Sequence, residues 1–316
     1  MPEADIACPY KPLSRVAAPD VITCGYLTII GLLVTVFAER IPHWWWYPLT
    51  HLMLILALGI FLLKIPPRPT GWVLFIRWWY PALLIPPIFS ELQSLVHPIN
   101  PGDIDAQLIA LDWALFGVHP TVWLERVTVP WLTEYMQLAY ATFYFLPFAL
   151  CAPLYRQGQF MAFRVSLCAL LLTYYVSYLL YFVTPAMGPR FYLAEYQTLP
   201  LVGLWLTAPL QAILDGLEGI QRDAFPSGHT AIALIVLAMA ARDQRHRFYP
   251  LLGVTVSLVI STVYLRYHYV IDVIAGVILA AVCLGVTCWL YREQGERYTE
   301  LVLSTHHSRW SSERRV

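Results

Sequence analysis

Two histidines and one aspartate stand out because their types and spacing suit proton and phosphoryl transfer. His229 ends the segment Phe225-Pro-Ser-Gly-His229, and His268 begins the pattern His268-x-x-x-Asp272. Residues four apart share one face of a helix. A carboxylate beside an imidazole keeps one ring nitrogen protonated and leaves the other as a base or nucleophile. A buried His–Asp pair that only ties two helices together fits the same spacing.

The residues before His229 predict an anion site. Pro226 precedes an expected helix start, Ser227 is a good N-cap, and Gly228 lets a ligand approach the backbone. The N–H groups of a helix start, together with the positive end of the helix dipole, favour phosphate. The alternative is a plain turn in which His229 is only a cap.

The elements that carry these residues are predicted to be membrane spans. Hydrophobic residues make up 59% of the 316 residues and charged residues 13%, whereas soluble proteins carry about 25% charged residues. This composition excludes a disordered chain, a basic nucleic-acid binder and an ordinary soluble enzyme. It predicts an all-α, polytopic transmembrane bundle of six to eight spans with interfacial helices. The expected spans are 21–38, 46–63, 72–90, 131–155, 163–183, 227–241, 249–265 and 269–291.

The distribution of basic residues favours eight spans with both termini in the cytoplasm. With this count, 15 of the 20 Lys and Arg residues fall on the inner side and 5 on the outer side, as the positive-inside rule requires. The chain then divides into a cytoplasmic segment 1–20, one catalytic membrane domain 21–291, and a cytoplasmic polar tail 292–316. Loops 91–130 and 184–226 lie on the outer side, where the acidic and apolar residues from Asp103 to Phe116 predict an interfacial helix.

The same map brings both histidines to the outer face, because one span begins beside His229 and another ends shortly before His268. The span 227–241 covers only about 22 Å at 1.5 Å per residue, whereas the hydrocarbon core is about 30 Å thick. His229 is therefore expected slightly below the headgroups, at a depth that suits a lipid with a phosphate head.

The two segments together resemble the type-2 phosphatidic acid phosphatase superfamily. The second one is close to the family pattern Ser-Arg-x5-His-x3-Asp, but Thr262 stands where that arginine is usual. The usual Lys-x6-Arg-Pro motif is absent, and Pro185-Ala-Met-Gly-Pro-Arg190 stands in its place. These departures, and parts of 111–150, look like the branch that includes inositol-phosphorylceramide synthase.

The resemblance and the local chemistry imply a role for each residue. His268 is the nucleophile that takes the phosphoryl group, Asp272 orients and charges it, and His229 is the acid and then the base. The backbone of Ser227 and Gly228, with Arg190, is expected to hold the phosphate oxygens. Arg266 lies two residues before His268 and is a further candidate only if the chain unwinds there; a lipid-headgroup contact is the alternative. No metal ion and no other cofactor is expected.

Three functions remain open. A phosphatase passes the phosphoryl group to water, and a transferase passes it, or a phospho-alcohol, to a lipid alcohol; the altered motifs favour transfer modestly. A transporter or channel could use the His–Asp pair as a proton relay, but we find no inverted repeat of the kind that many such proteins have. The expected partners are the membrane and a lipid phosphate or phospholipid, with the site on the periplasmic or lumenal side and no nucleic acid.

Overall fold

The computed structural model describes residues 16–66, 69–218 and 221–312, and within them the side chains of all but 217–218 and 293–312. This described part is helical and contains no strand. Of the predicted terminal segments, residues 1–15 and 313–316 lie outside the described residues, and residues 292–312 continue the helix that begins at Val270. The α-helices are α1 Ala18–Val36, α2 Trp46–Lys64, α3 Gly71–Leu83, α4 Ile85–Ile99, α5 Asp105–Phe116, α6 Pro120–Trp123, α7 Pro130–Ala141, α8 Leu146–Arg156, α9 Phe160–Val183, α10 Pro189–Tyr192, α11 Thr207–Glu218, α12 Gly228–Asp243, α13 Arg245–Tyr264 and α14 Val270–Ser312.

Seven segments of the described chain are long and apolar enough to cross a membrane, which confirms the predicted polytopic helix bundle. They are 18–36, 46–64, 71–99, 130–156, 160–183, 245–264 and 270–292. The remaining predicted span corresponds to α12, which has 16 residues and is as short as the sequence indicated. The third segment extends to Ile99, nine residues beyond the predicted end at Ser90.

Prolines explain the two interrupted segments. Pro86 and Pro87 stand in the first turn of α4, where a helix tolerates proline because its first N–H groups have no partner within the helix. The helix therefore restarts after Leu84 and continues to Ile99. In the same way Pro147 stands at the start of α8, after the 3₁₀ turn Thr142–Phe145 that separates α8 from α7.

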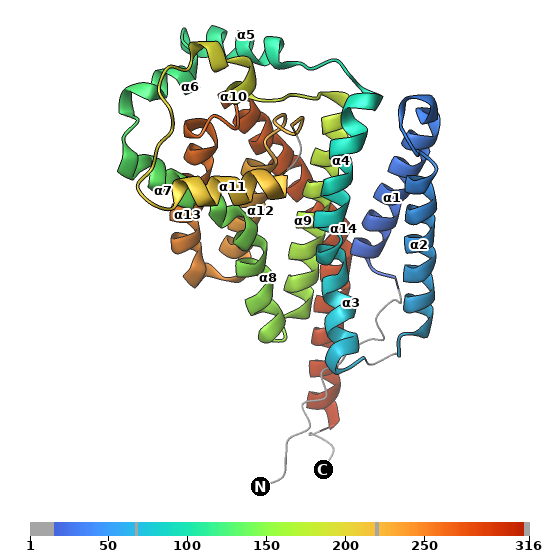
Figure 1. Cartoon of the computed structure of the whole chain (residues 1–316). Helices are drawn as coiled ribbons and strands as arrows, with labels where there is room; N and C mark the ends of the chain where they lie inside the picture. Colours follow the sequence, from blue (N-terminus) through green and yellow to red (C-terminus); the bar gives the residue numbers. More distant parts are fainter. Residues whose placement is uncertain (1–15, 67–68, 219–220, 313–316) are drawn as a thin grey trace.

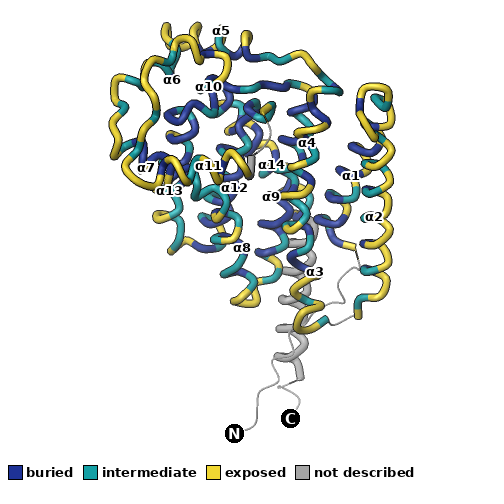
Figure 2. The backbone as a smooth tube through the Cα atoms, viewed as in Figure 1, coloured by how far each residue is buried: buried dark blue, intermediate teal, exposed yellow. Residues whose placement is uncertain are grey.

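Helix α9 is the centre of the bundle. It packs against α1, α4, α8, α12 and α14, and 72% of its most apolar stretch is buried, compared with 17% for α2. Figure 2 shows this contrast, with dark blue along α9 and yellow along α2. The exposed apolar residues of α2 are typical of a helix that faces lipid.

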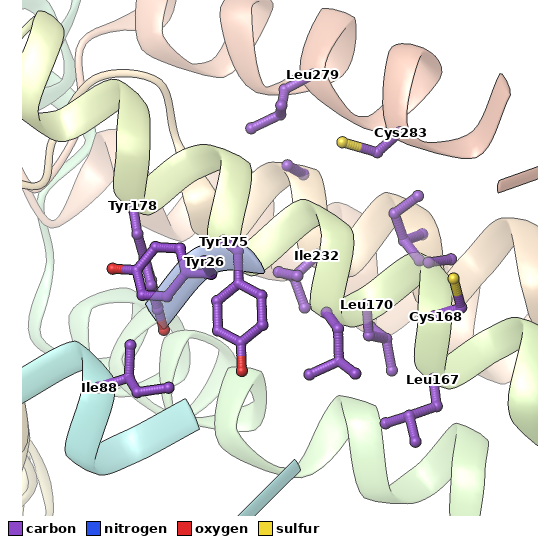
Figure 3. Close-up of a cluster of buried hydrophobic side chains, with 14 of the residues drawn as sticks. Tyr26, Ile88, Leu167, Cys168, Leu170, Tyr175, Tyr178, Ile232, Leu279 and Cys283 are labelled. Atoms are coloured by element: carbon purple, nitrogen blue, oxygen red, sulfur yellow. The ribbon is translucent and has the colours of Figure 1, made fainter. Parts of the chain in front are cut away.

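Tightly packed rings join α1 to α9. The rings of Tyr26 and Tyr175 are stacked with their centroids 4.5 Å apart, and Tyr178 meets Tyr26 edge-on at 6.2 Å. Figure 3 shows these three tyrosines beside Ile88 of α4 and Ile232 of α12. Because lipid tails are as apolar as the core, such close packing, and not the exclusion of water, holds membrane helices together.

The irregular segments gather at one end of the bundle. Figure 1 shows α5, α6 and α10 together at this end, whereas α3 and α8 end towards the opposite one. Helices α12 and α14 both begin near α5 and α10, so the starts of two core helices meet the two long loops. This end, which we call the loop end, holds both histidine segments.

A buried ion pair fastens α1 to α3 near the opposite end. Arg77 donates to both carboxylate oxygens of Asp20, at 2.9 and 2.7 Å, and neither residue is more than 7% exposed. The Tyr80 hydroxyl and the Ala17 backbone N–H also donate to Asp20. All of these donors are needed because an unpaired charge inside a membrane protein is costly.

We predict that Asp20→Asn lowers the stability of the purified protein by about 3 to 5 kcal/mol, because it leaves Arg77 buried without its counter-charge. Replacing both partners, as Asp20→Leu with Arg77→Met, is expected to cost less than either single change. Thermal unfolding in detergent would be measured for the wild type, Asp20→Asn, Arg77→Met and the double variant. Equal losses in the single and double variants would contradict a coupled pair.

Candidate active site

The structure brings His229, His268 and Asp272 together at the loop end. The Nδ1 atom of His229 lies 3.3 Å from the Nε2 atom of His268, and the Nδ1 atom of His268 lies 3.5 Å from a carboxylate oxygen of Asp272. Asp272 is fully buried and His268 is 3% exposed. Helix α12 carries His229 in its first turn, the turn between α13 and α14 carries His268, and α14 carries Asp272.

The tautomer of His268 is set by a backbone carbonyl that the sequence did not predict. Its Nδ1 atom lies 2.8 Å from the carbonyl oxygen of Ala224, closer than Asp272. Because a carbonyl only accepts, Nδ1 carries a proton, and in the neutral ring Nε2 keeps its lone pair. Ala224 is itself fixed, because its N–H donates to the carbonyl of Ala186. Ala224 thus provides the shorter contact to Nδ1 of His268, and the Asp272 carboxylate oxygen lies beyond it at 3.5 Å.

A cavity of about 300 Å³ opens onto the two imidazoles. Its charged and aromatic lining includes Arg190, Asp215, Asp223, Tyr140 and Tyr267. Phe191, Met187, Gln221 and Ala224 complete it. Of the predicted site residues, His229, His268 and Arg190 line this cavity.

The aromatic rings hold His229 in place. The ring of Phe143 lies 4.2 Å and that of Tyr140 lies 4.8 Å from the His229 ring, measured between centroids. On its other side Tyr140 stacks on Tyr267 at 4.4 Å. This stack joins α7 to the turn that carries His268, so the two imidazoles are supported by one set of packed rings.

Arg190 reaches the cavity from α10. Its guanidinium donates to Asp215 of α11 at 3.0 Å and lies 5.1 Å from the centre of the Tyr267 ring. Its backbone N–H donates to the carbonyl of Arg266 at 3.0 Å. A cation held against an aromatic ring is partly desolvated and oriented, so Arg190 is well placed to meet an anion in the cavity.

Ser227 and Gly228 act differently from the prediction that their backbone holds phosphate. Ser227 is buried, its hydroxyl accepts the N–H of Thr230, and its own N–H donates to the carbonyl of Asp272. Ser227 therefore caps α12, as predicted, and ties it to α14. Neither residue lines the cavity. At Gly228 an added Cβ would lie 2.7 Å from the Tyr181 hydroxyl, so this glycine serves close helix packing.

Arg266 does not reach the cavity. The chain does unwind there, since Arg266 has φ +66° between α13 and α14. Its guanidinium nevertheless donates to Glu125 at 2.8 Å and to the carbonyl of Leu199 at 2.7 Å. Burial lowers the pKa of Arg266, and the neighbouring Glu125 acts in the opposite direction. Its geometry is that of a link between the two outer loops, not of a phosphate ligand.

The acidic residues in and before α5 are also structural. Asp105 and Asp112 lie on the buried face of α5, with Leu108 between them, whereas Trp113 and Phe116 are exposed. Burial raises the pKa of both carboxyls, and the backbone N–H groups that they accept lower it. Asp103 accepts two bonds from Arg222, at 2.7 and 3.1 Å.

Glu134 of α7 fastens the segment before α11. Its carboxylate accepts the backbone N–H groups of residues 204–207 and the Thr207 hydroxyl, over 2.6 to 3.3 Å. The N–H groups of Leu206 and Thr207 belong to the start of α11, where a helix supplies no partner of its own, and those of residues 204 and 205 precede the helix. Glu134 thus fixes the backbone that leads into α11.

Comparison with known proteins agrees with this geometry. The model of the PAP2 superfamily matches residues 106–286, which are more than half of the chain and include both histidine segments. The chain belongs to the PAP2 superfamily. The seven long apolar helices add that the chain is a multi-pass membrane protein.

A more distant similarity is found to a PA-phosphatase related-family protein of Dictyostelium discoideum. It is 25% identical over an alignment of 177 positions, which covers 48% of this chain and 31% of that relative. The chain thus matches about a third of the relative's length. No solved structure gives a significant match.

No group of three or more His, Cys, Asp or Glu side chains that could hold a metal ion is found in the described part of the chain. The histidines at 43, 97 and 119 do not converge on the cavity lining. His119 instead lies between the rings of Trp113 and Tyr196, at 4.9 and 5.5 Å.

Gly188 is predicted to be essential to the cavity wall. It has φ +92°, and an added Cβ would lie 2.6 Å from the backbone oxygen of Tyr267. Gly188→Ala should therefore cost more than the roughly 1 to 2 kcal/mol of a left-handed alanine, because it also pushes the Arg190 loop off the His268 turn. Gly117→Ala is the matched control, since Gly117 has φ +67° and open space around it. Thermal unfolding and turnover of both variants test this, and equal effects would contradict it.

Proposed function

We propose that the protein is a membrane phosphotransferase that uses His268 as a nucleophile on a lipid phosphate or phospholipid. The observation that carries this proposal is the orientation of His268, whose Nδ1 atom is bonded to Ala224 while Nε2 points at His229 beside the cavity. Such a pair can attack phosphorus with one ring and move a proton with the other.

The reaction balances in two steps. In the first, Nε2 of His268 attacks phosphorus, the P–N bond forms, the bond to the leaving oxygen breaks, and His229 gives that oxygen a proton. In the second, His229 takes the proton of an acceptor hydroxyl, whose oxygen attacks phosphorus as the P–N bond breaks. Arg190 lies where it can neutralise the phosphate oxygens throughout, and Asp272 stabilises the charge on His268. The scheme uses no metal ion.

The charge of the cavity favours a phosphodiester substrate, and so favours headgroup transfer over hydrolysis of a phosphomonoester. Among the described residues the lining holds one arginine, Arg190, against two carboxylates, Asp215 and Asp223. A phosphomonoester carries nearly two negative charges at pH 7, whereas a phosphodiester carries one. Two further arginines of the loop end, Arg222 and Arg266, are engaged by Asp103 and Glu125. This agrees with a transferase of the inositol-phosphorylceramide type.

A phosphatase of the same mechanism is the second candidate, because water can replace the lipid alcohol as acceptor. A proton relay through a transporter is less well supported. Its proton path would have to cross the membrane, whereas the site lies at one end of the bundle, beside a cavity lined by groups that suit a bound anion.

We predict that His268→Ala lowers turnover about a thousandfold or more while the protein still inserts and purifies normally. Purified protein in mixed micelles would be given phosphatidic acid, a polyprenyl pyrophosphate or phosphatidylinositol, each with and without a lipid alcohol. A new phospholipid that forms only with the alcohol indicates a transferase, and free phosphate without it indicates a phosphatase. Activity should persist in EDTA.

His119→Ala is the matched control, because His119 is a loop-end histidine outside the cavity lining. It is expected to retain turnover. Full activity of His268→Ala would rule out the mechanism, and loss of activity in both variants would point to damage that is not specific to the site.

We further propose that the site faces the periplasm or an organelle lumen and that both termini are cytoplasmic, as the basic residues indicate. In a cysteine-free background, a membrane-impermeant maleimide applied from the non-cytoplasmic side should label Glu195→Cys. It should not label Gln157→Cys, which lies in the exposed turn between α8 and α9. The reverse pattern would overturn the orientation.

A further inference from the structure

One buried carboxylate touches both halves of the catalytic machinery. Asp105, the first residue of α5, is fully buried. One of its oxygens accepts the N–H of Met187 at 2.9 Å, and the other accepts the N–H of Gly188 at 2.8 Å and the hydroxyl of Tyr269 at 2.9 Å. Gly188 lies two residues before Arg190, and Tyr269 directly follows His268.

The loop of Arg190 and the turn of His268 are in direct contact. The Arg190 N–H donates to the carbonyl of Arg266, and the Arg190 guanidinium lies 5.1 Å from the centre of the Tyr267 ring. Gly188 also lies against the backbone of Tyr267. Asp105 adds a charge-assisted link, because a carboxylate that accepts N–H and O–H groups makes stronger hydrogen bonds than a neutral acceptor.

We propose that Asp105 is a positioning residue whose bond to Tyr269 couples the Arg190 loop to the His268 turn, so that the phosphate-binding guanidinium and the nucleophile keep a fixed separation. This inference rests on the proposed function. In-line transfer requires the phosphate and the attacking nitrogen to be aligned, and a misplacement of about 1 Å can cost about a hundredfold in rate. The coupling therefore acts on both substrate affinity and the chemical step.

Asp112 provides a matched comparison on the same helix. It lies on the same buried face of α5, and its two oxygens accept the N–H groups of Val270 and Ile271 at 3.0 and 2.9 Å. These bonds cap the start of α14 and thus hold only the His268 side. Within the described residues Asp112 makes no hydrogen bond to the Arg190 loop, so its replacement should affect the nucleophile but not the arginine.

The test compares Tyr269→Phe, Asp105→Asn and Asp112→Asn in the purified full-length chain. For the lipid that the wild type turns over, kcat, KM and the inhibition constant of inorganic phosphate would be measured. Tyr269→Phe, which removes only the linking hydroxyl, should lower kcat about tenfold, and Asp105→Asn about a hundredfold. Both should raise KM and weaken phosphate inhibition severalfold. Asp112→Asn should lower kcat and leave the phosphate constant within about twofold of the wild type.

The double variant separates coupling from general damage. If the two groups act through one bond, Asp105→Asn with Tyr269→Phe should be no worse than Asp105→Asn alone. Additive losses, wild-type kinetics of Tyr269→Phe, or equal effects of Asp105→Asn and Asp112→Asn on phosphate inhibition would overturn the proposal. Should Asp105→Asn fail to fold, Tyr269→Phe decides alone. An inactive wild type would refute the proposed function, and this inference with it, whereas an active wild type with unaffected variants would refute only the coupling.

Discussion

Buried carboxylates that accept backbone N–H groups are the interaction on which the loop end depends. Irregular backbone has no ladder of internal hydrogen bonds, and in or near a membrane each unsatisfied group is costly. Asp105, Asp112 and Glu134 supply the missing acceptors for three separate segments. Glu125 does the same for Leu199 while it pairs with Arg266. The two long loops can thus be ordered without strands or disulfides.

The loop end carries many acidic residues, whereas the substrate that we propose is an anion. The engagement of these carboxylates in hydrogen bonds and ion pairs explains how the two can be compatible. Most of the acidic side chains at the loop end are occupied by N–H groups or by arginine, so they contribute little free negative charge to the cavity. Asp215 and Asp223 remain in the lining, and Asp215 orients the guanidinium of Arg190. The field inside the cavity is therefore set locally by Arg190, the two imidazoles and the two carboxylates of the lining, not by the overall balance of charge.

Much of the fold and the centre of the site could be predicted from sequence, and the reasons for success and failure are physical. Long apolar runs fix spans because the membrane requires about 20 residues of helix. The sequence predicted that His229 and His268 lie at the same end of the bundle, because a short helix starts beside His229 and the next helix runs back to end shortly before His268. By contrast, the partners of Arg266 and Asp105 lie far away in sequence, at Glu125 and Gly188. Spacing within one helix carries no information on such contacts, so the sequence offered Arg266 as a candidate phosphate ligand and gave no sign of the role of Asp105. The carbonyl of Ala224 could not be foreseen at all, because every residue has one.

The replacement of the usual arginine by Thr262 follows the same logic. Thr262 is buried, and its carbonyl accepts the N–H groups of both Tyr267 and His268, at 3.0 Å each. The turn that presents His268 is therefore shaped by backbone bonds that do not depend on the side chain at this position. A threonine in place of the arginine removes one positive charge from this segment, and Arg190, on another loop, is the arginine of the cavity lining. Arg190 is shared with Asp215, so the positive charge that it can offer to a phosphate is partly neutralised. This local balance of charge is the reason why the proposed function favours a phosphate with two ester bonds over a phosphate with one.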